Sequence, residues 1–168
     1  IARTGLGGGM NLQGSGGILL QNLTIANNSA PCGVCFAGGI SNGQGLPITM
    51  RNTVFQNNTG GNAFNPWTLL HPVSGSNNIQ WPQTRPGSNQ TEALVTPGAV
   101  YANAQLVAIA GNGGLTETMA LLSGTPAVNS GNPLDAPATD QRGMPRVGSV
   151  DVGAYELQPD LIFSNGFD

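Results

Sequence analysis

Two stretches of this chain repeat one another at a distance of 30 residues, and this period restricts the fold more than any other feature. The repeated positions share glycine, apolar and asparagine residues: Gly8, Gly9 and Met10 recur as Gly38, Gly39 and Ile40; Ile18, Leu20, Asn22 and Ile25 as Ile48, Met50, Asn52 and Phe55; and Asn27, Asn28 and Ser29 as Asn57, Asn58 and Thr59. A fixed period of roughly 20 to 50 residues is typical of units that cannot bury their apolar face alone and must stack on copies of themselves. The period therefore predicts a solenoid.

The pattern inside one unit indicates the kind of solenoid. Ile18 and Leu20 alternate with polar or outward positions at period two, which is a strand signal and not a helical stripe. Asn22, matched by Asn52, lies between two short strands, and asparagine tolerates the left-handed backbone of a sharp corner. We expect the two amides to stack as an interior ladder, one rung (~4.8 Å) apart. Short strands, asparagine corners and paired glycines predict an all-β parallel β-helix.

The rungs are predicted to occupy residues 1–110, with loop insertions at 30–37 and 82–98. Ile79 and Trp81 lie 31 residues beyond Ile48 and Met50, so we expect them to continue the same inward columns in a third rung. The loop 82–98 is rich in Gln, Thr, Asn, Ser and Pro, which favours an exposed loop.

Composition excludes several classes of function. The chain has 168 residues, of which 39% are hydrophobic and only 8% charged, against roughly 25% charged in most globular domains. The net charge of −3 without a basic cluster argues against nucleic-acid binding, because a phosphate backbone demands a basic face. No apolar run approaches the roughly 18 residues of a membrane span. No signal peptide is visible, so we interpret Ile1 as an internal position of a longer precursor.

Cys32 and Cys35 form the single CxxC pair. One pair supplies half the ligands of a four-cysteine zinc site, and His71 is the sole histidine, so we expect no metal and no other cofactor. A thioredoxin-like role would need the pair at the start of a helix after a strand, which this context does not offer. We favour a loop-stapling disulfide formed in an oxidising compartment.

The last third of the chain carries a family resemblance. Its segments are Asn-Gly-Gly-Leu-Thr-Glu-Thr-Met-Ala-Leu-Leu (112–122), Gly-Thr-Pro-Ala-Val-Asn-Ser-Gly (124–131), Asp-Gln-Arg-Gly-Met-Pro-Arg (140–146) and Asp-Val-Gly-Ala-Tyr-Glu (151–156). In order and spacing they resemble the C-terminal signature of bacterial secreted right-handed β-helix proteins of the choice-of-anchor Q type. Upstream, Gly-Gly-Ile (38–40) and Phe-Gln-Asn-Asn (55–58) are similar to the GGxI and FxxN elements of polymorphic outer-membrane proteins.

The resemblance implies a fold and a location more than a reaction. It implies a right-handed parallel β-helix of the pectin-lyase-like kind, located outside the cell or on the outer surface of a Gram-negative bacterium. It also implies that residues 111–158 form a signature segment closing the helix. Residues 159–168 look like a short C-terminal tail of secreted gammaproteobacterial proteins.

Charge gathers in that signature segment, where five charged residues fall within 17 positions: Asp140, Arg142, Arg146, Asp151 and Glu156. One interpretation is that Asp140 and Asp151 act as acid and base on a glycan. The other is a structural ion-pair network, with Arg142 bidentate to a carboxylate, that fixes the segment against the end of the helix. We favour the network, because residues 1–81, where a lyase would place its base and its Ca²⁺ ligands, contain no Asp, Glu or Lys.

The sequence as a whole favours a non-catalytic structural or adhesive β-helix module, secreted or on the cell surface, within a larger precursor. The alternative is a polysaccharide-active or glycan-binding β-helix, with surface glycans as partners. The first rung offers unpaired strand edges with little charge to protect them. We therefore expect it to be covered by the rest of the precursor or by another copy of the chain, the latter giving end-to-end oligomers or filaments.

Overall fold

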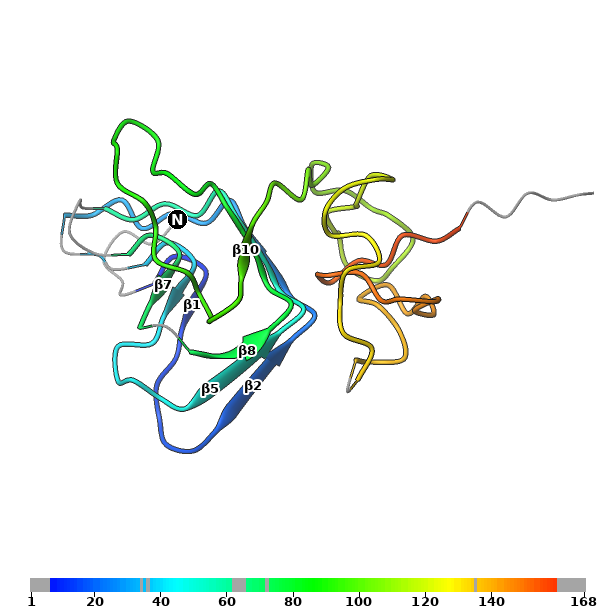
Figure 1. Cartoon of the computed structure of the whole chain (residues 1–168), viewed down its shortest axis with the longest axis horizontal. Helices are drawn as coiled ribbons and strands as arrows, with labels where there is room; N and C mark the ends of the chain where they lie inside the picture. Colours follow the sequence, from blue (N-terminus) through cyan, green and yellow to red (C-terminus); the bar gives the residue numbers. More distant parts are fainter. Residues whose placement is uncertain are drawn as a thin grey trace, which may run out of the picture.

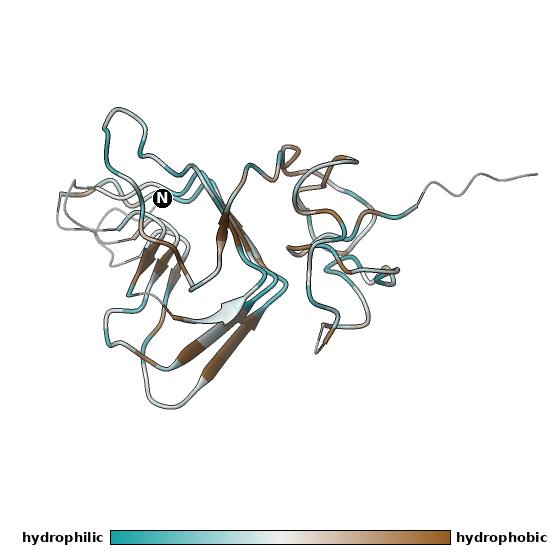
Figure 2. Cartoon of the chain, viewed as in Figure 1, coloured by the Kyte–Doolittle hydropathy of each residue, from teal (hydrophilic) through white to brown (hydrophobic). Residues whose placement is uncertain are grey.

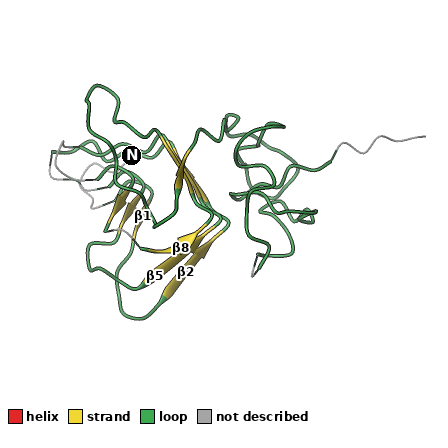
Figure 3. Ribbon diagram, viewed as in Figure 1, coloured by secondary structure: helices red, strands yellow, loops and turns green. Residues whose placement is uncertain are grey.

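The computed structural model describes residues 7–33, 35, 37–61, 66–71, 73–134 and 136–159. Within these ranges the chain forms ten short β-strands and no helix (Figure 3). The strands are β1 (Met10–Asn11), β2 (Ile18–Gln21), β3 (Thr24–Ala26), β4 (Ile40–Ser41), β5 (Ile48–Arg51), β6 (Val54–Gln56), β7 (Leu69–Leu70), β8 (Ser74–Ser76), β9 (Ile79–Trp81) and β10 (Val100–Tyr101).

The strands form three parallel sheets whose orders are β1-β4-β7, β2-β5-β8 and β10-β9-β6-β3. These sheets enclose the interior of a parallel β-helix (Figure 1), as the repeat predicts. The first rung holds β1 to β3, the second β4 to β6, and the third β7 to β9. Each rung buries an apolar face that a lone rung would leave in water, and this is why the repeats stack.

The register of the first two rungs confirms the 30-residue period. Ile18 pairs with Ile48 and Leu20 pairs with Met50, in one sheet. Ile40 and Met50 are fully buried, and Ile48 is nearly so, in one core between the sheets. The strand alternation read from the sequence therefore gives the correct inward face for these rungs.

In the third rung the expected columns are wrong. Ile79 pairs with Val54 and Trp81 pairs with Gln56, in the sheet beyond the corner, and not with the residues that follow Ile18 and Leu20. The partner of Met50 is Gly75, only 25 residues later. The reason is a shorter turn, because three residues join β7 to β8 whereas six join β4 to β5. A fixed 31-residue offset therefore assigns Ile79 to the wrong sheet.

Gly75 shows how the shortened rung fits. Its φ is +137°, and a Cβ at this position would lie 1.7 Å from the carbonyl oxygen of Met50. Only glycine fits so close to the strand below. The strand β8 brings no apolar side chain to the core, which Figure 2 shows as a pale arrow above the brown β5 and β2. Val95 and Leu94, from the loop that follows, join the core instead.

The loop 82–98 is not simply exposed, as its composition suggested, but crosses the end of the third rung (the green segment of Figure 1). Val95 is 1% exposed, and its carbonyl accepts a 3.2 Å hydrogen bond from the Val73 N–H. The amide side chain of Gln80 donates to the Ala93 carbonyl and accepts from the Val95 N–H. These contacts satisfy backbone groups that a bare last rung would leave to water.

Residues 102–159 pack beside the β-helix, as the yellow to red segment of Figure 1 shows. They contact the outer face of the sheet β10-β9-β6-β3, which offers Val54 and Ile79. A second apolar core forms there with Ala104, Leu121, Ala127 and Val152. The segment 111–158, expected to close the helix, thus lies along its side, and the loop 82–98 covers the end.

Candidate functional site

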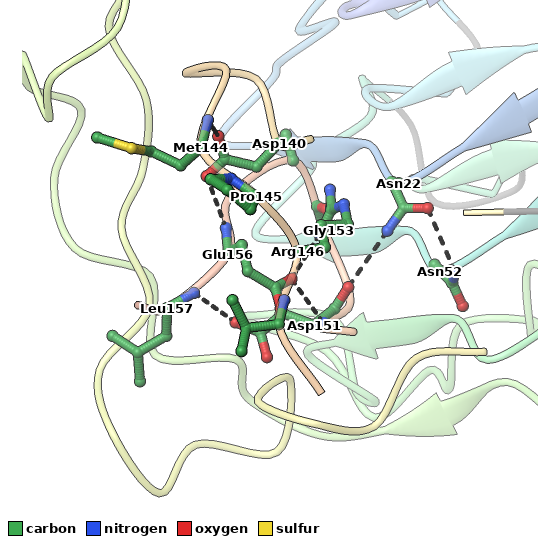
Figure 4. Close-up of polar contacts among 12 residues, drawn as sticks. Asn22, Asn52, Asp140, Met144, Pro145, Arg146, Asp151, Gly153, Glu156 and Leu157 are labelled. Carbon is green, nitrogen blue, oxygen red and sulfur yellow. Dashed lines mark hydrogen bonds and ion pairs between the residues drawn. The ribbon is translucent and has the colours of Figure 1, made fainter. Parts of the chain in front are cut away.

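The five charged residues singled out in the sequence come together in the C-terminal segment, and Figure 4 labels four of them, Asp140, Arg146, Asp151 and Glu156. Two ion pairs form, Arg142 with Asp140 and Arg146 with Glu156, at 2.8 and 2.7 Å. The arginine side chains are only 6% and 3% exposed. Arginine is suited to such burial because it is weakly hydrated and donates several hydrogen bonds in a fixed geometry.

Asp140 accepts hydrogen bonds on both carboxylate oxygens. Its Oδ1 accepts from the backbone N–H groups of Arg142 and Met144, at 2.8 and 3.1 Å. Its Oδ2 accepts from Arg142 Nε and from the Glu156 N–H, at 2.8 and 3.0 Å. Burial raises the pKa of Asp140, but these hydrogen bonds outweigh it and leave the pKa below its ordinary value.

Glu156 joins three parts of the segment. Its Oε2 accepts from Arg146 and from the Asp151 N–H at 2.9 Å, and its Oε1 accepts from the Val147 N–H at 3.1 Å. Arg146 donates in addition to the carbonyl of Gly153 at 3.0 Å. The Arg146 Nε is the one guanidinium atom of this pair that is buried without a hydrogen-bond partner in the described part of the chain.

Asp151 differs from Asp140 in that no arginine of the described residues forms an ion pair with it. Its Oδ1 and Oδ2 accept from the backbone N–H groups of Asn129 and Leu157, at 2.7 and 2.6 Å. Burial raises the pKa of Asp151, and the charge of Glu156 raises it further, so the pKa stays above its ordinary value despite the two hydrogen bonds.

The hydrogen bonds that the carboxylate oxygens already accept decide what chemistry this cluster can perform. Each of the six oxygens of Asp140, Asp151 and Glu156 accepts at least one hydrogen bond from the protein itself. The ring of Tyr155, next to Glu156 in the chain, is covered by the Arg142 guanidinium at 3.7 Å from the ring centre. A general acid or base must reach a proton on its substrate. This arrangement directs the carboxylates at the protein's own backbone and favours the structural interpretation.

The cluster is connected to the asparagine corners of the β-helix. Asn22 and Asn52 have φ values of 49° and 50°, as left-handed corner residues require, and they are 5% and 0% exposed. Asn52 Nδ2 donates to Asn22 Oδ1 at 3.3 Å, and Asn22 Nδ2 donates to the Asp151 carbonyl at 3.3 Å. Asn52 also exchanges two 2.8 Å hydrogen bonds with the backbone of Asn132. The amides thus contact one another but also bind the C-terminal segment beside the rungs.

A second group of asparagines, which sequence reasoning noted as repeated but assigned no role, supports the other corner. Asn28 donates to Asn58 Oδ1 at 3.1 Å, and Asn58 Nδ2 donates to the Ile25 carbonyl at 2.7 Å. Thr59 donates to Ser29 at 3.0 Å. The repeated Asn-Asn-Ser/Thr was the signal for this ladder.

The buried pair Arg85 and Glu92 was missed entirely. Glu92 contacts Arg85 through Oε1 and accepts through Oε2 from the backbone N–H groups of Trp67 and Thr68, at 3.0 and 3.3 Å. The two residues are 7% and 3% exposed. The Arg85 guanidinium also lies 5.4 Å from the ring centre of Trp67. One arginine and one glutamate in a loop otherwise free of charge were the available signal.

Cys32 and Cys35 form a disulfide in the structure, with Cα atoms 5.1 Å apart. The described parts of the chain contain no group of three His, Cys, Asp or Glu residues that could hold a metal ion. They also contain no helix long and apolar enough to cross a membrane. Residues 160–168, which include most of the C-terminal tail proposed from the sequence, lie outside the described residues.

A groove of about 380 Å³ is a second candidate site. It lies along the sheet β1-β4-β7 and the turns that follow its strands. Its lining is neutral and rich in amides: Asn11, Leu12, Gln13, Ser41, Gly43, Gln44, Leu70 and His71. Ser41 is fully buried, and its hydroxyl has no hydrogen-bond partner among the described residues.

The comparison with known proteins adds no relative to these observations. No protein-family model, curated protein or solved structure matches the chain. The structure by itself identifies the architecture. Its three parallel sheets in register make this chain a β-solenoid of the parallel β-helix type.

Proposed function

We propose that this chain is a non-catalytic structural or adhesive module of a larger secreted or cell-surface β-solenoid protein. The single observation that carries the proposal is that the buried charged side chains are paired within the protein. Asp140, Asp151 and Glu156 are buried, and all their oxygens bind groups of the protein itself. Arg85 and Glu92, within the loop that covers the last rung, are likewise buried and paired. Burying charges in this way is expensive unless they are fully paired, which fits a scaffold.

The location is proposed from the sequence resemblance. The segments 112–122, 140–146 and 151–156 resemble secreted β-helix proteins of the choice-of-anchor Q type and would place the chain outside a Gram-negative cell. The disulfide of Cys32 and Cys35 supports an oxidising compartment. The intact mass and N-terminal sequence of the native protein, recovered from the medium and from washed cells, would test this location. Recovery from the cytoplasm alone would contradict it.

The scaffold role is tested against catalysis directly. The chain is incubated with polygalacturonate, alginate and a neutral glucan, and unsaturated product and new reducing ends are measured with and without Ca²⁺. We expect no turnover above the buffer blank. Turnover that is lost in Asp151→Asn but kept in Glu117→Gln, an exposed control, would show that the C-terminal carboxylates are catalytic and would overturn the proposal.

Glycan binding is the second candidate, and the amide-rich groove favours it. Its lining contains no Asp, Glu, Lys or Arg, so a neutral hydroxyl-rich ligand fits better than an acidic one. Gln13→Ala and His71→Asn should each weaken binding to an array of neutral oligosaccharides. Asparagine at 71 tolerates the φ of +66° that His71 adopts. Asn89→Ala, in the exposed part of the loop 82–98, is the control.

A further inference from the structure

The two ends of the β-helix are built differently. The third rung is covered by the loop 82–98, whose Val95 enters the core and whose Glu92 accepts the Trp67 and Thr68 N–H groups. The first rung has no such cover within the described residues. Its strands β1, β2 and β3 are each the terminal strand of a sheet, all at the same end of the solenoid.

The core is correspondingly open at the first rung. Met10, Ile18 and Leu20 are only partly buried, although their partners one rung on, Ile40, Ile48 and Met50, are 0%, 3% and 0% exposed. The same side-chain columns are therefore closed in the second rung and open in the first. The difference comes from what lies on the far side of the rung, because the residue types are alike.

The first rung also has few of the features that prevent edge pairing. Residues 7–33 contain no Asp, Glu, Lys or Arg, and their single proline, Pro31, follows the last strand of the rung. Protein edges that must stay unpaired are usually protected by charges, prolines or a covering segment. This edge has the properties of a rung interface, and it continues the interface already present between the first and second rungs.

We propose that the first rung is a docking edge for one more rung of the same solenoid, supplied by polypeptide that leads into Gly7 in the same molecule. This inference rests on the proposed scaffold role. The occupant must run parallel to β1, β2 and β3, carry apolar residues under Met10, Ile18 and Leu20, and carry glycines under Gly8 and Gly9. The glycines are required because a Cβ on Gly8 would lie 2.4 Å from the carbonyl oxygen of Gly38, one rung on, and a Cβ on Gly9 would lie 2.9 Å from that of Gly39.

A second copy of the chain cannot meet these requirements. Its third rung is covered by the loop 82–98, so a head-to-tail contact would have to displace Val95 from the core. Its first rung could approach only head to head, and two-fold symmetry would then set the strands antiparallel. The parallel register of the existing rungs therefore points to a rung in the same molecule, and open filaments are not expected.

The test lengthens the solenoid by its own period. A copy of residues 7–36 is inserted between Leu6 and Gly7, so that the chain enters the original first rung as it now enters the second at Ala37. The matched control carries the same insertion with I18N and L20N in the inserted copy only. Amide hydrogen exchange of β2 in the original rung is the main readout, with thermal melting and light scattering beside it.

We expect the insertion to slow exchange of the original β2 amides at least about tenfold and to raise the melting temperature, because an edge strand becomes an internal one. The control should show neither effect. Equal protection with both insertions would overturn the proposal. So would slow exchange of β2, equal to that of β5, in the unmodified chain, because the edge would then already be covered. This second readout holds even if the insertion fails to fold.

A dimer of the unmodified chain whose β2 protection rises with concentration would show that a second copy is the occupant, and would also overturn the proposal. These outcomes are independent of the polysaccharide assay. Turnover of a glycan would contradict the scaffold role, whereas failure of the inserted rung to protect β2 would contradict only the docking edge.

Discussion

The rungs and the C-terminal segment satisfy their buried backbone in two different ways. In the first and second rungs the main chain bonds to the next rung, and the side chains that assist are neutral amides such as Asn28 and Asn58. In the C-terminal segment the described residues after β10 form no strand longer than an isolated bridge. Three carboxylates instead accept seven backbone N–H groups: those of Asn129, Arg142, Met144, Val147, Asp151, Glu156 and Leu157.

The comparison teaches that, in the C-terminal segment, charged side chains take the place of the repeating backbone hydrogen bonds of the rungs. A repeating rung offers each N–H a carbonyl one rung away, whereas an irregular segment has no such partner and must use side chains. Carboxylates accept several N–H groups at once, and the arginines compensate their charge. The two regions should therefore respond differently to mutation and to pH.

The largest effect should follow from a charge in the closed part of the core. Ile48→Asp places an unpaired carboxylate where the side chain is 3% exposed. It should unfold the chain, because burying an unpaired charge costs several kcal/mol. Ile18→Asp, at the same column position in the half-open first rung, should leave a folded protein with a lower melting temperature. Equal melting of the two variants by circular dichroism would contradict the difference between the rungs.

Next in size is the loss of a buried ion pair in the C-terminal segment. Glu156→Gln leaves Arg146 charged and buried without a carboxylate, and it should lower the free energy of unfolding by about 3–5 kcal/mol. Glu117→Gln, at an exposed position, is the control and should change little. Denaturant melts measure the loss. Hydrogen exchange should show faster exchange after residue 102 than in β5, and a uniform increase would argue that the two regions unfold as one unit.

A smaller effect is expected where the two regions meet. Asn52→Ala removes the amide that binds both Asn22 and the backbone of Asn132, and it should cost about 1–3 kcal/mol because buried partners lose their hydrogen bonds. Asn89→Ala, an exposed position, should be neutral. If both substitutions had the same effect on urea melting, the corner would not be the point where the segment attaches.

The pH dependence should be the smallest effect, because two carboxylates act in opposite directions. The pKa of Asp140 is lowered by folding, so its contribution is present above the unfolded pKa and lost as pH falls through the folded pKa. The pKa of Asp151 is raised, so its ionisation weakens the fold, and stability returns as pH falls through its folded pKa. The two partly cancel between neutral and acid pH.

Two variants separate these contributions. The stability difference between the wild-type chain and Asp140→Asn should shrink as the pH falls from the unfolded pKa of Asp140 through its lower folded pKa. The acid-dependent gain should disappear in Asp151→Asn. Melting temperatures measured from pH 7 downward, at constant ionic strength, would follow both. A difference for Asp140→Asn that grows toward acid pH would contradict the sign of its pKa shift.

The amino-acid sequence alone determined the architecture and its register over two rungs. The 30-residue spacing of Ile18 and Ile48 was sufficient, because a solenoid repeats its local environment and each position then reports the same surroundings. The clustering of Asp140, Arg142, Arg146, Asp151 and Glu156 could also be expected, since these residues are close along the chain.

Only the tertiary structure decided where the pattern changes. The short turn before β8 moved Ile79 into another sheet, and Gly75 could be recognised as the partner of Met50 only from the packed rungs. The composition of the loop 82–98, rich in Gln, Thr, Asn, Ser and Pro, predicts exposure, yet Arg85 and Glu92 within it are buried because each neutralises the other. Such pairings depend on which segments meet in space, and a period in the sequence carries that information only where the chain repeats itself.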